Sequence, residues 1–240
     1  METHVRYLAR SPIFETERAF STDFPVDHVD RARRTNHEVD DRPVTVAPIE
    51  DPSQWKLDVH GFCILHAETH LDPQDVYTKK KEVQGGYWYE IEAILHKHFP
   101  QYSRVESFDL TVYDLVQNLS WQVVSTSRWL IDPRSVWRPL VGSTDDWPLA
   151  LCDYTTINTE EDIRLNDAIR RDLVGEGSLL HYNEAHRWYY LKDQGVNDLI
   201  VFRNSDSQGK RARCFHAAVF NPDAKGPPRQ SVEVRVAAFY

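Results

Sequence analysis

"RCFHAAVFNPDAKGPPRQSVEVRV" (residues 213–236) contains two strand-like stretches separated by a turn with three prolines. The first stretch places one histidine, His216, inside an apolar run. In the second stretch, "QSVEVRV", valines alternate with polar residues at a period of two, which is the pattern of a half-buried strand. Arg229 lies two residues before Ser231, where the turn leads into this strand. The stretch therefore predicts two strands that carry polar groups close to them.

Similar patterns recur after Pro100, at 104–112 and 121–131 among others, and together they predict about eight strands, most of them in the second half of the chain. Helices are expected at 72–99, with Asp72 as the cap and Gly85-Gly86 as a candidate break, and at 158–173. A hairpin is expected at 178–191. This distribution favours a mainly β fold with flanking helices (α+β), built as a double-stranded β-helix or jelly-roll barrel of the cupin-like kind.

The chain is expected to form a single domain over residues 1–240, in which residues 1–55 are polar and turn-rich. They predict an extended N-terminal arm with little regular structure, and a long arm of this kind would suit a homodimer. The formal net charge of −9 and the lack of a long basic run argue against nucleic acid or an anionic membrane as partner. With no long apolar stretch and three isolated cysteines expected to be reduced, a cytoplasmic protein is predicted.

The mouth of a jelly-roll barrel can hold iron, and the ligands for that site are two histidines and one carboxylate on one face of the ion. Two of these ligands usually come as His-x-Asp or His-x-Glu on one strand, because alternate residues point the same way. His216 would fit the third, downstream ligand. Arg229 and Ser231 would fit a clamp for the distal carboxylate of 2-oxoglutarate, since a guanidinium fork matches a carboxylate.

The upstream ligand pair is missing from the strands. His70 and Asp72 have the required spacing, but they lie at the start of the expected helix, where Asp72 is a better cap than a ligand. His216 alone is more typical of a structural histidine, and Arg229 alone of a solvated turn residue. The spacing of residues does not by itself establish a metal site in this chain.

Several motifs in order resemble the fungal hydroxylase/desaturase family that includes gibberellin-desaturase-like proteins. They are "SVWRPLVGSTDDWPLALCD" (135–153), "LLHYNEAHRWYYL" (179–191), "LIVFRNSDS" (199–207) and "FHAAVFNPDAKGPPRQSVEVRV" (215–236). Earlier stretches, "SPIFETERAF", "VHGFCIL" and "SRVESFDLTV", are also similar, so that the resemblance covers nearly the whole chain. It implies an iron(II)/2-oxoglutarate oxygenase-like protein of secondary metabolism.

The chain departs from this family at the iron site. Family members continue after the "FD" element with a histidine and a basic pair, and they carry His-x-Asp before the "WRP" motif. Here Leu110 takes the place of that histidine and Tyr113-Asp114 that of the basic pair, and the stretch of about two dozen residues from Asp109 to Val136 holds no histidine. The resemblance thus implies a degenerate iron site in which only His216, Arg229 and Ser231 match.

Three functions follow as hypotheses. The favoured one is a metal-independent tailoring enzyme for a small apolar, polyketide- or terpenoid-like metabolite, with no cofactor, which catalyses a cyclisation, isomerisation, dehydration or pericyclic reaction. The alternative keeps Fe(II) and 2-oxoglutarate for a hydroxylase or desaturase, with His216 joined by Asp109 or Asp114 as unconventional ligands. The third is a non-catalytic binding protein, for which a collapsed pocket would be expected.

For the favoured function, histidines near neutral pH are the acid–base candidates, and aromatic and polar groups would bind the substrate. The alternative reading of the aromatic residues is that they form core, and that Arg138 pairs with Asp145 or Asp146. The catalytic candidates are His216, His186 and His181. The substrate-binding candidates are Arg229, Ser231, Arg138, Trp137, Trp188, Tyr190 and Tyr182.

Overall fold

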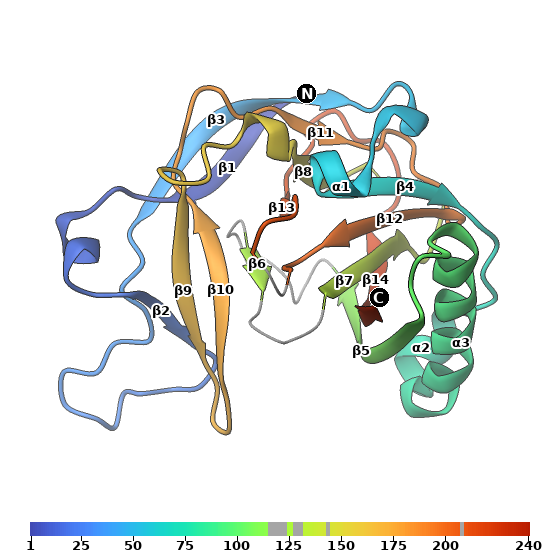
Figure 1. Ribbon diagram of the computed structural model, residues 1–240, viewed down its shortest axis with the longest axis horizontal. Coiled ribbons are helices and arrows are strands. Elements are labelled where there is room, and N and C mark those ends of the chain that lie inside the picture. The colour runs from blue at the N-terminus through green and yellow to red at the C-terminus, as the bar shows by residue number, and fades with distance from the viewer. Residues whose placement is uncertain (115–123, 127–131, 143–144, 207–208) are drawn as a thin grey trace.

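The computed structural model describes residues 1–114, 124–126, 132–142, 145–206 and 209–240, without the side chains of 114, 124–126 and 132. Two sheets dominate this part of the chain, and their strands curl around a common interior (Figure 1). The five-stranded sheet has the order β4-β12-β7-β14-β5. Its strands are β4 (Phe62–His66), β5 (Arg104–Asp114), β7 (Asp132–Pro139), β12 (Asp198–Arg203) and β14 (Gln230–Phe239).

The nine-stranded sheet has the order β1-β3-β11-β8-β13-β6-β10-β9-β2. Most of its neighbours are antiparallel, but β3 pairs in parallel with β11, and β2 with β9. Its strands are β1 (Glu2–Leu8), β2 (Ala19–Thr22), β3 (Val39–Pro48), β6 (Val124–Thr126), β8 (Leu149–Cys152), β9 (Ile163–Ile169), β10 (Val174–Leu180), β11 (Trp188–Tyr190) and β13 (Phe215–Ala218). This arrangement confirms the mainly β, jelly-roll prediction.

Helices α2 (Pro73–Thr78) and α3 (Lys80–His98) lie on the outer side of the five-stranded sheet (Figure 1). Helix α1 (Leu57–His60) lies apart from them and directly precedes β4. The chain also has short 3-10 turns at η1 (Pro12–Glu15), η2 (Pro52–Gln54) and η3 (Tyr154–Thr156). The side chain of Asp72 accepts a hydrogen bond from the backbone N–H of Gln74, which confirms its prediction as a cap. No helix in the described part of the chain is long and apolar enough to cross a membrane.

Strand β14 separates two environments because its successive side chains point to opposite faces. Val232, Val234 and Val236 face outward and pack with Ile91 and Leu95 of α3. The face between them carries Ser231, Glu233 and Arg235, which therefore point into the space between the sheets. The alternating sequence "QSVEVRV" thus gives one strand an apolar outer face and a polar inner face.

The nine-stranded sheet divides its side chains in the same way. Leu149 and Leu151 of β8 face inward and pack with Trp137 and Phe202 of the opposite sheet. The alternate residues of β8, β11 and β13 face outward and form a separate core with β1 and β3. The interior core and this outer core therefore lie on opposite faces of the same strands.

The N-terminal segment has more regular structure than the sequence indicates. Strand β1 pairs with β3 over seven residue pairs, from Glu2–Thr45 to Leu8–Val39. The outer core of the nine-stranded sheet needs this cover, since Val5, Tyr7 and Val46 are almost completely buried in it. The prediction of an arm with little regular structure is wrong for this reason.

Two further predictions of local structure are wrong. Residues 163–169, expected in a helix, form strand β9, which makes a hairpin with β10. Residues 178–191, expected as a hairpin, do not pair with each other: β10 pairs with β9 and β6, whereas β11 pairs with β3 and β8. Only Val124–Thr126 of the strand expected at 121–131 lies among the described residues, and it forms β6.

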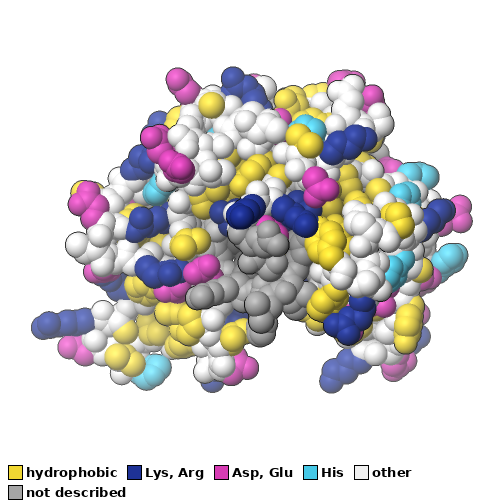
Figure 2. Space-filling view, in the orientation of Figure 1, with side chains coloured by type: hydrophobic (Ala, Val, Ile, Leu, Met, Phe, Trp, Pro, Cys, Tyr) yellow, Lys and Arg dark blue, Asp and Glu magenta, His cyan; other side chains and the backbone are white. Residues whose placement is uncertain are grey.

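The surface is a mixture of charge types on the face shown in Figure 2. Acidic and basic side chains are interspersed among the described residues there, and hydrophobic side chains lie between them.

Candidate functional site

A buried carboxylate, Glu233, is the centre of the polar inner face. Its Oε1 accepts a hydrogen bond from Ser135 Oγ at 2.5 Å, and its Oε2 accepts one from Tyr113 OH at 2.9 Å. Arg235 Nε donates to Oε1 at 3.3 Å. These partners come from β5, β7 and β14, because inward-facing residues of neighbouring strands lie opposite one another. Glu233 is thus fully engaged by donors from its own sheet.

Arg235 links this carboxylate to a second one. Its Nη1 lies 3.6 Å from Asp109 Oδ2, and Asp109 is the residue directly opposite Arg235 on β5. Thr111 Oγ1 donates to the same carboxylate oxygen at 3.1 Å. One guanidinium therefore lies between two carboxylates, of which Glu233 is buried and Asp109 is partly exposed.

Burial would raise the pKa of Glu233, but Arg235, His216 and the hydrogen bonds from Ser135 and Tyr113 together hold its pKa below the usual value. Glu233 is therefore ionised at neutral pH. Burial, with the charge of Glu233 next, also raises the pKa of Tyr113 well above normal, so that its hydroxyl keeps its proton and donates. The carboxylate is held in place as an anion by neutral and positive donors.

His216 is the one predicted catalytic histidine that lies on the inner side of the nine-stranded sheet. Its ring contacts Phe202 of the opposite sheet at a centroid distance of 4.5 Å, and part of the side chain remains exposed. Its Nδ1 lies 3.4 Å from the carbonyl oxygen of Cys214. Burial lowers the pKa of His216, although the charge of Glu233 opposes this, so the ring is neutral at neutral pH and can accept a proton.

Arg229 and Ser231 form the other end of the inner face. Arg229 Nη1 donates to the carbonyl oxygen of Trp147 at 3.0 Å, and its guanidinium carbon lies 5.9 Å from the centre of the Trp137 ring. Burial lowers the pKa of Arg229, despite the opposing charge of Asp146. Arg229 Nε and Ser231 Oγ are both buried and have no hydrogen-bond partner among the described residues.

Two unsatisfied buried polar atoms, one of them on a guanidinium, are costly unless a ligand pairs with them. A carboxylate or carbonyl oxygen is the complementary group. The residues present therefore fit the predicted role of Arg229 and Ser231, and they fit the distal carboxylate of 2-oxoglutarate as well as a carboxylate or carbonyl of a substrate.

The described residues do not provide the ligands of an iron ion. They include no group of three or more His, Cys, Asp or Glu side chains that could hold a metal. Around His216, the carboxylate of Glu233 is occupied by three donors, and Asp109 is paired with Arg235. The stretches left out add no His, Cys, Asp or Glu in the sequence, while the side chains of Asp114, the other ligand considered, and of Asp132 lie outside the described part.

The predicted binding residues Trp188 and Tyr190 lie on the other side of the nine-stranded sheet from His216. They pack with Phe215 and Ala217, which alternate with His216 along β13 and so face outward. Tyr182 belongs to the same outer cluster and lies edge-on to Tyr7 at 5.4 Å. These aromatic residues are therefore core under the N-terminal strands and are not brought together with Arg229 and Ser231.

The predicted catalytic residues His186 and His181 also lie at this outer core. His186 Nε2 is 3.1 Å from Asp162 Oδ2, and its ring stacks on Tyr7. His181 Nδ1 is 2.8 Å from the carbonyl oxygen of Leu8. Both fasten the N-terminal strands to the sheet, and burial lowers the pKa of each.

Of the remaining candidates, Trp137 faces inward below Arg229, whereas Arg138 faces outward. Arg138 Nε donates to Tyr87 OH of α3 at 2.9 Å, and its Nη1 donates to the carbonyl oxygen of Pro139 at 3.0 Å. The expected pairing with Asp145 or Asp146 is not among its contacts in the described residues. His70 is bonded to Glu90 on the surface, away from the interior.

The interior network around Glu233 was missed from the sequence. The sequence pattern identifies Glu233 and Arg235 only as polar positions of an alternating strand. Their alternation with the valines was the signal that they share a face with Ser231. Tyr113 and Ser135 had no signal, because their pairing with Glu233 depends on which strands are neighbours in the sheet.

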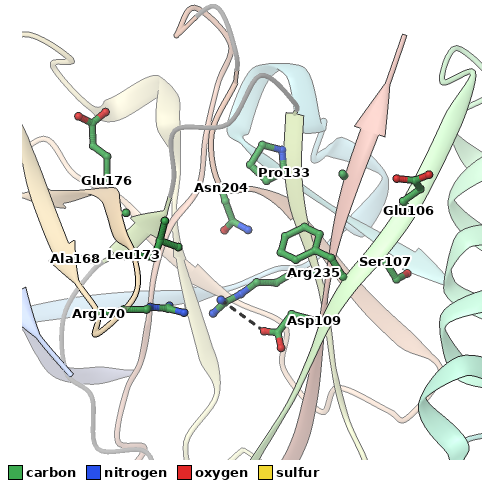
Figure 3. Close-up of a pocket in the computed structure, with 13 residues that line it drawn as sticks. Glu106, Ser107, Asp109, Pro133, Ala168, Arg170, Leu173, Glu176, Asn204 and Arg235 are labelled. Carbon is green, nitrogen blue, oxygen red and sulfur yellow. Dashed lines mark ion pairs between the residues drawn. The ribbon is translucent and has the colours of Figure 1, made fainter. Parts of the chain in front are cut away.

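An open cavity adjoins the Arg235 end of this network (Figure 3). It has a volume of about 580 Å³ and lies between β5, β7 and β14 on one side and the β9–β10 hairpin on the other. Asp109, Asn204 and Arg235 contribute to both the network and the cavity wall. The polar interior is thus connected to a space of the size that holds small molecules.

Two sheets curled into a jelly roll, with a polar inner face and an Arg/Ser pair at one end, define the class of 2-oxoglutarate-oxygenase-like barrels. A family model described as "Oxidoreductase/YMDC permease-like domain" matches residues 6–128 and 128–239. The Fe(II)/2-oxoglutarate-dependent dioxygenase nvfI of Aspergillus novofumigatus is 34% identical over 221 aligned residues, which cover 77% of this chain and 78% of that protein. The chain belongs to this family of fungal oxygenase-like proteins, which confirms the resemblance seen in its motifs.

Other relatives match over shorter segments. Aspirochlorine biosynthesis protein N of Aspergillus oryzae is 36% identical over 112 residues, which cover 44% of this chain and 47% of that protein. The gibberellin cluster GA4 desaturase of Gibberella fujikuroi is 24% identical over 123 residues, covering 47% of this chain and 35% of the desaturase. The chain therefore spans about half or less of these two relatives.

Solved structures show that the fold is shared over the whole chain. The iron and alpha-ketoglutarate-dependent endoperoxidase NvfI superposes with a TM-score of 0.83, and a variant of it with 0.86. Each superposition is 20% identical in sequence and covers 100% of this chain and 97% of the other. The chain thus shares the fold of these two structures over its whole length.

Proposed function

We propose that the protein is a tailoring enzyme of fungal secondary metabolism that catalyses a non-oxidative step, such as an isomerisation, a dehydration or a cyclisation. The observation that supports this most directly is the donor set around His216. Its nearest carboxylate partners are paired with Arg235, Ser135 and Tyr113, and the described residues supply no three-ligand face for iron. The proposed reaction therefore uses only protein side chains.

Arg229 and Ser231 would anchor the substrate. Arg229 Nε and Ser231 Oγ are the buried donors without a described partner, and a carbonyl or carboxylate oxygen would satisfy both. Trp137 would form the apolar floor below this group, which suits a small apolar, polyketide- or terpenoid-like metabolite. Orientation of a flexible substrate against such a fixed anchor can contribute several kcal/mol to catalysis.

His216 would act as the general acid–base group. Its ring is neutral at neutral pH because burial lowers its pKa, and Glu233 stabilises the positive charge that a transferred proton would create. In an isomerisation, His216 would take a proton from a carbon next to the anchored carbonyl and return it to another carbon. Substrate and product then have the same formula, and no oxidant is consumed.

The test uses an extract of a fungal strain in which the gene is deleted, so that the natural substrate accumulates. Purified protein is added without oxygen and with a strong chelator, and the extract is followed by mass spectrometry. The expected result is conversion of one metabolite into an isomer or into a product that differs by water. His216→Ala and Arg229→Gln should each lower the rate by at least about a hundredfold, the usual contribution of acid–base catalysis.

A product that differs from its substrate by an added oxygen atom or by the loss of two hydrogen atoms, and that forms only in air with Fe(II), would refute this function. The absence of any conversion with the wild-type protein under both conditions would instead favour a binding protein. Unchanged rates in both variants would remove the assigned roles of His216 and Arg229.

The second candidate is an Fe(II)/2-oxoglutarate-dependent hydroxylase or desaturase. It is supported by the family and by the fit of Arg229 and Ser231 to a carboxylate of 2-oxoglutarate. If those cofactors bind, the metal supplies oxygen chemistry, and this chain would supply the Arg229 clamp and the interior that excludes water. Stoichiometric iron in the purified protein, with succinate formed in step with the metabolite, would establish this candidate in place of the first.

A further inference from the structure

The cavity of Figure 3 is lined by two arginines, Arg170 and Arg235, and by three carboxylates. Glu176 Oε2 accepts a hydrogen bond from Arg18 at 2.8 Å, Glu106 pairs with Arg104 at 3.4 Å, and Asp109 pairs with Arg235 at 3.6 Å. Each carboxylate that lines the cavity therefore already has a cation beside it. Arg170, which follows β9 directly, also lines the cavity and makes no ion pair within the described part of the chain.

Arg170 and Arg235 point toward one another across the cavity (Figure 3). Arg235 uses Nε for Glu233 and Nη1 for Asp109, and its Nη2 makes no hydrogen bond to any described residue. Glu233 and Asp109 already offset the charge of Arg235, whereas Arg170 has no carboxylate partner in the described part of the chain. An anion between the two guanidinium groups would pair with Arg170 and accept a hydrogen bond from Arg235. Each of them offers donors in the planar fork that matches a carboxylate.

The walls around this pair are mostly apolar. Ala168, Leu173 and Ala237 line the cavity, and the side chain of Leu173 is 44% exposed. The register shift between Arg235 and Val236 leaves Phe108 without a partner on β14, and this bulge exposes 53% of its ring at the cavity. Large apolar side chains held open to solvent beside a cavity are typical of a binding site.

We infer that this cavity binds an amphipathic organic acid, whose carboxylate lies between Arg170 and Arg235 and whose apolar skeleton lies against Phe108 and Leu173. The inference rests on the proposed function only in treating this acid as the substrate of the barrel. The cavity is distinct from the Arg229 clamp, because Arg229 precedes β14, six positions before Arg235, and only Arg235 lines the cavity.

The experiment measures the binding of an unreactive probe, 2-naphthoate, to the full chain by titration calorimetry. Its neutral analogue, 2-naphthalenemethanol, has the same ring system without the charge. Naphthoate should bind more tightly than the alcohol, and this preference should shrink in high salt. Arg170→Gln should weaken naphthoate binding about tenfold and leave the alcohol unchanged, because one charged hydrogen-bond donor is lost.

Two control variants locate the site. Arg171→Gln removes the neighbouring exposed charge, which does not line the cavity, and should leave naphthoate binding unchanged. Arg229→Gln alters the other candidate anion site and tests whether naphthoate binds there instead. The inference is overturned if naphthoate shows no saturable binding, if it binds no better than the alcohol, if Arg171→Gln weakens it as much as Arg170→Gln, or if only Arg229→Gln weakens it.

These outcomes are independent of the reaction. Probe binding that follows Arg170 would stand even if the extract assay found an oxidative product. Conversely, a non-oxidative conversion that is unaffected by Arg170→Gln, together with no probe binding, would leave the proposed function in place and remove this site.

Discussion

Glu233 is the residue whose loss should disturb the interior most. We predict that Glu233→Gln lowers the free energy of unfolding by about 2 to 4 kcal/mol, because it leaves Arg235 buried with one carboxylate in place of two. The matched control is Glu106→Gln, which removes a carboxylate from the exposed pair with Arg104 and should cost less than about 1 kcal/mol. Urea unfolding of both variants measures the difference. Equal effects would mean that the interior pair is no more costly to break than a surface pair.

At this scale, the sequence predicted part of the candidate site. His216, Arg229, Ser231 and Trp137 do lie on the inner side of the barrel. Strand alternation fixes which side of a strand a residue occupies, but it does not say which side is inward, and this is why Trp188, Tyr190 and His186 were grouped with them. Glu233 was missed because its importance comes from donors on two other strands.

At the scale of elements, two glycines in helical segments should respond in opposite ways to alanine. Gly61 ends α1 with φ 84°, and a Cβ there would lie 2.4 Å from the backbone carbon of Arg213. Gly86, exposed in the middle of α3, has nothing within 4 Å of an added Cβ. We predict that Gly61→Ala destabilises by at least about 2 kcal/mol, whereas Gly86→Ala stabilises by about 0.5 to 1 kcal/mol.

Thermal unfolding followed by circular dichroism measures both changes. A destabilised Gly86→Ala variant would show that α3 needs flexibility at its centre, and an unchanged Gly61→Ala variant would show that the loop at Arg213 can move away. The sequence treated Gly85-Gly86 as a candidate break, but α3 continues through them from Lys80 to His98. The break lies instead at Lys79, between α2 and α3.

Local signals misled the prediction for 158–173. Asn158 and the acidic residues after it look like the start of a helix, but Asp162 accepts hydrogen bonds from Asn183 and lies beside His186. These long-range partners stabilise a turn, after which residues 163–169 continue as a strand. Tertiary contacts therefore outweighed the local preference, and no sequence window of this length contains them.

At the scale of the whole molecule, the two buried histidines, His181 and His186, and the half-buried His216 should make stability depend on pH. Burial lowers the pKa of His181, His186 and His216 in the folded state, while in the unfolded chain a histidine titrates near about 6.5. The unfolded state thus binds more protons below that pH. Stability should be complete above about pH 6.5 and should fall as the pH drops below it.

Urea unfolding at about pH 7.5 and pH 5.5 should show a loss of at least about 1 kcal/mol at the lower pH. His216→Asn should reduce this slope, and the control His28→Gln, at an exposed position, should not. A stability that is constant or that rises toward pH 5.5 would contradict the assignment of these three side chains as neutral in the folded protein.

The mainly β, jelly-roll architecture was predicted correctly because it depends on the number of alternating segments and on their length, which are properties of the whole chain. The first 55 residues were not, because β1 and β3 are stabilised by burial against Trp188 and Tyr190, far along the chain. Short polar strands of this kind carry little pattern of their own.

The alternation of side chains along β14 determines how the sequence of such a barrel can change during evolution. Strand β14 is hydrogen-bonded to β5 on one side and to β7 on the other, which fixes its backbone. Its two sets of side chains nevertheless face different surroundings, the helix α3 and the lumen. Substitution at the even-numbered valines would disturb the packing of α3, whereas substitution at 231, 233 or 235 changes the polar groups of the lumen and leaves the packing of α3 in place. Deleting a single residue from the strand would exchange the two sets, and it would lose scaffold and chemistry together.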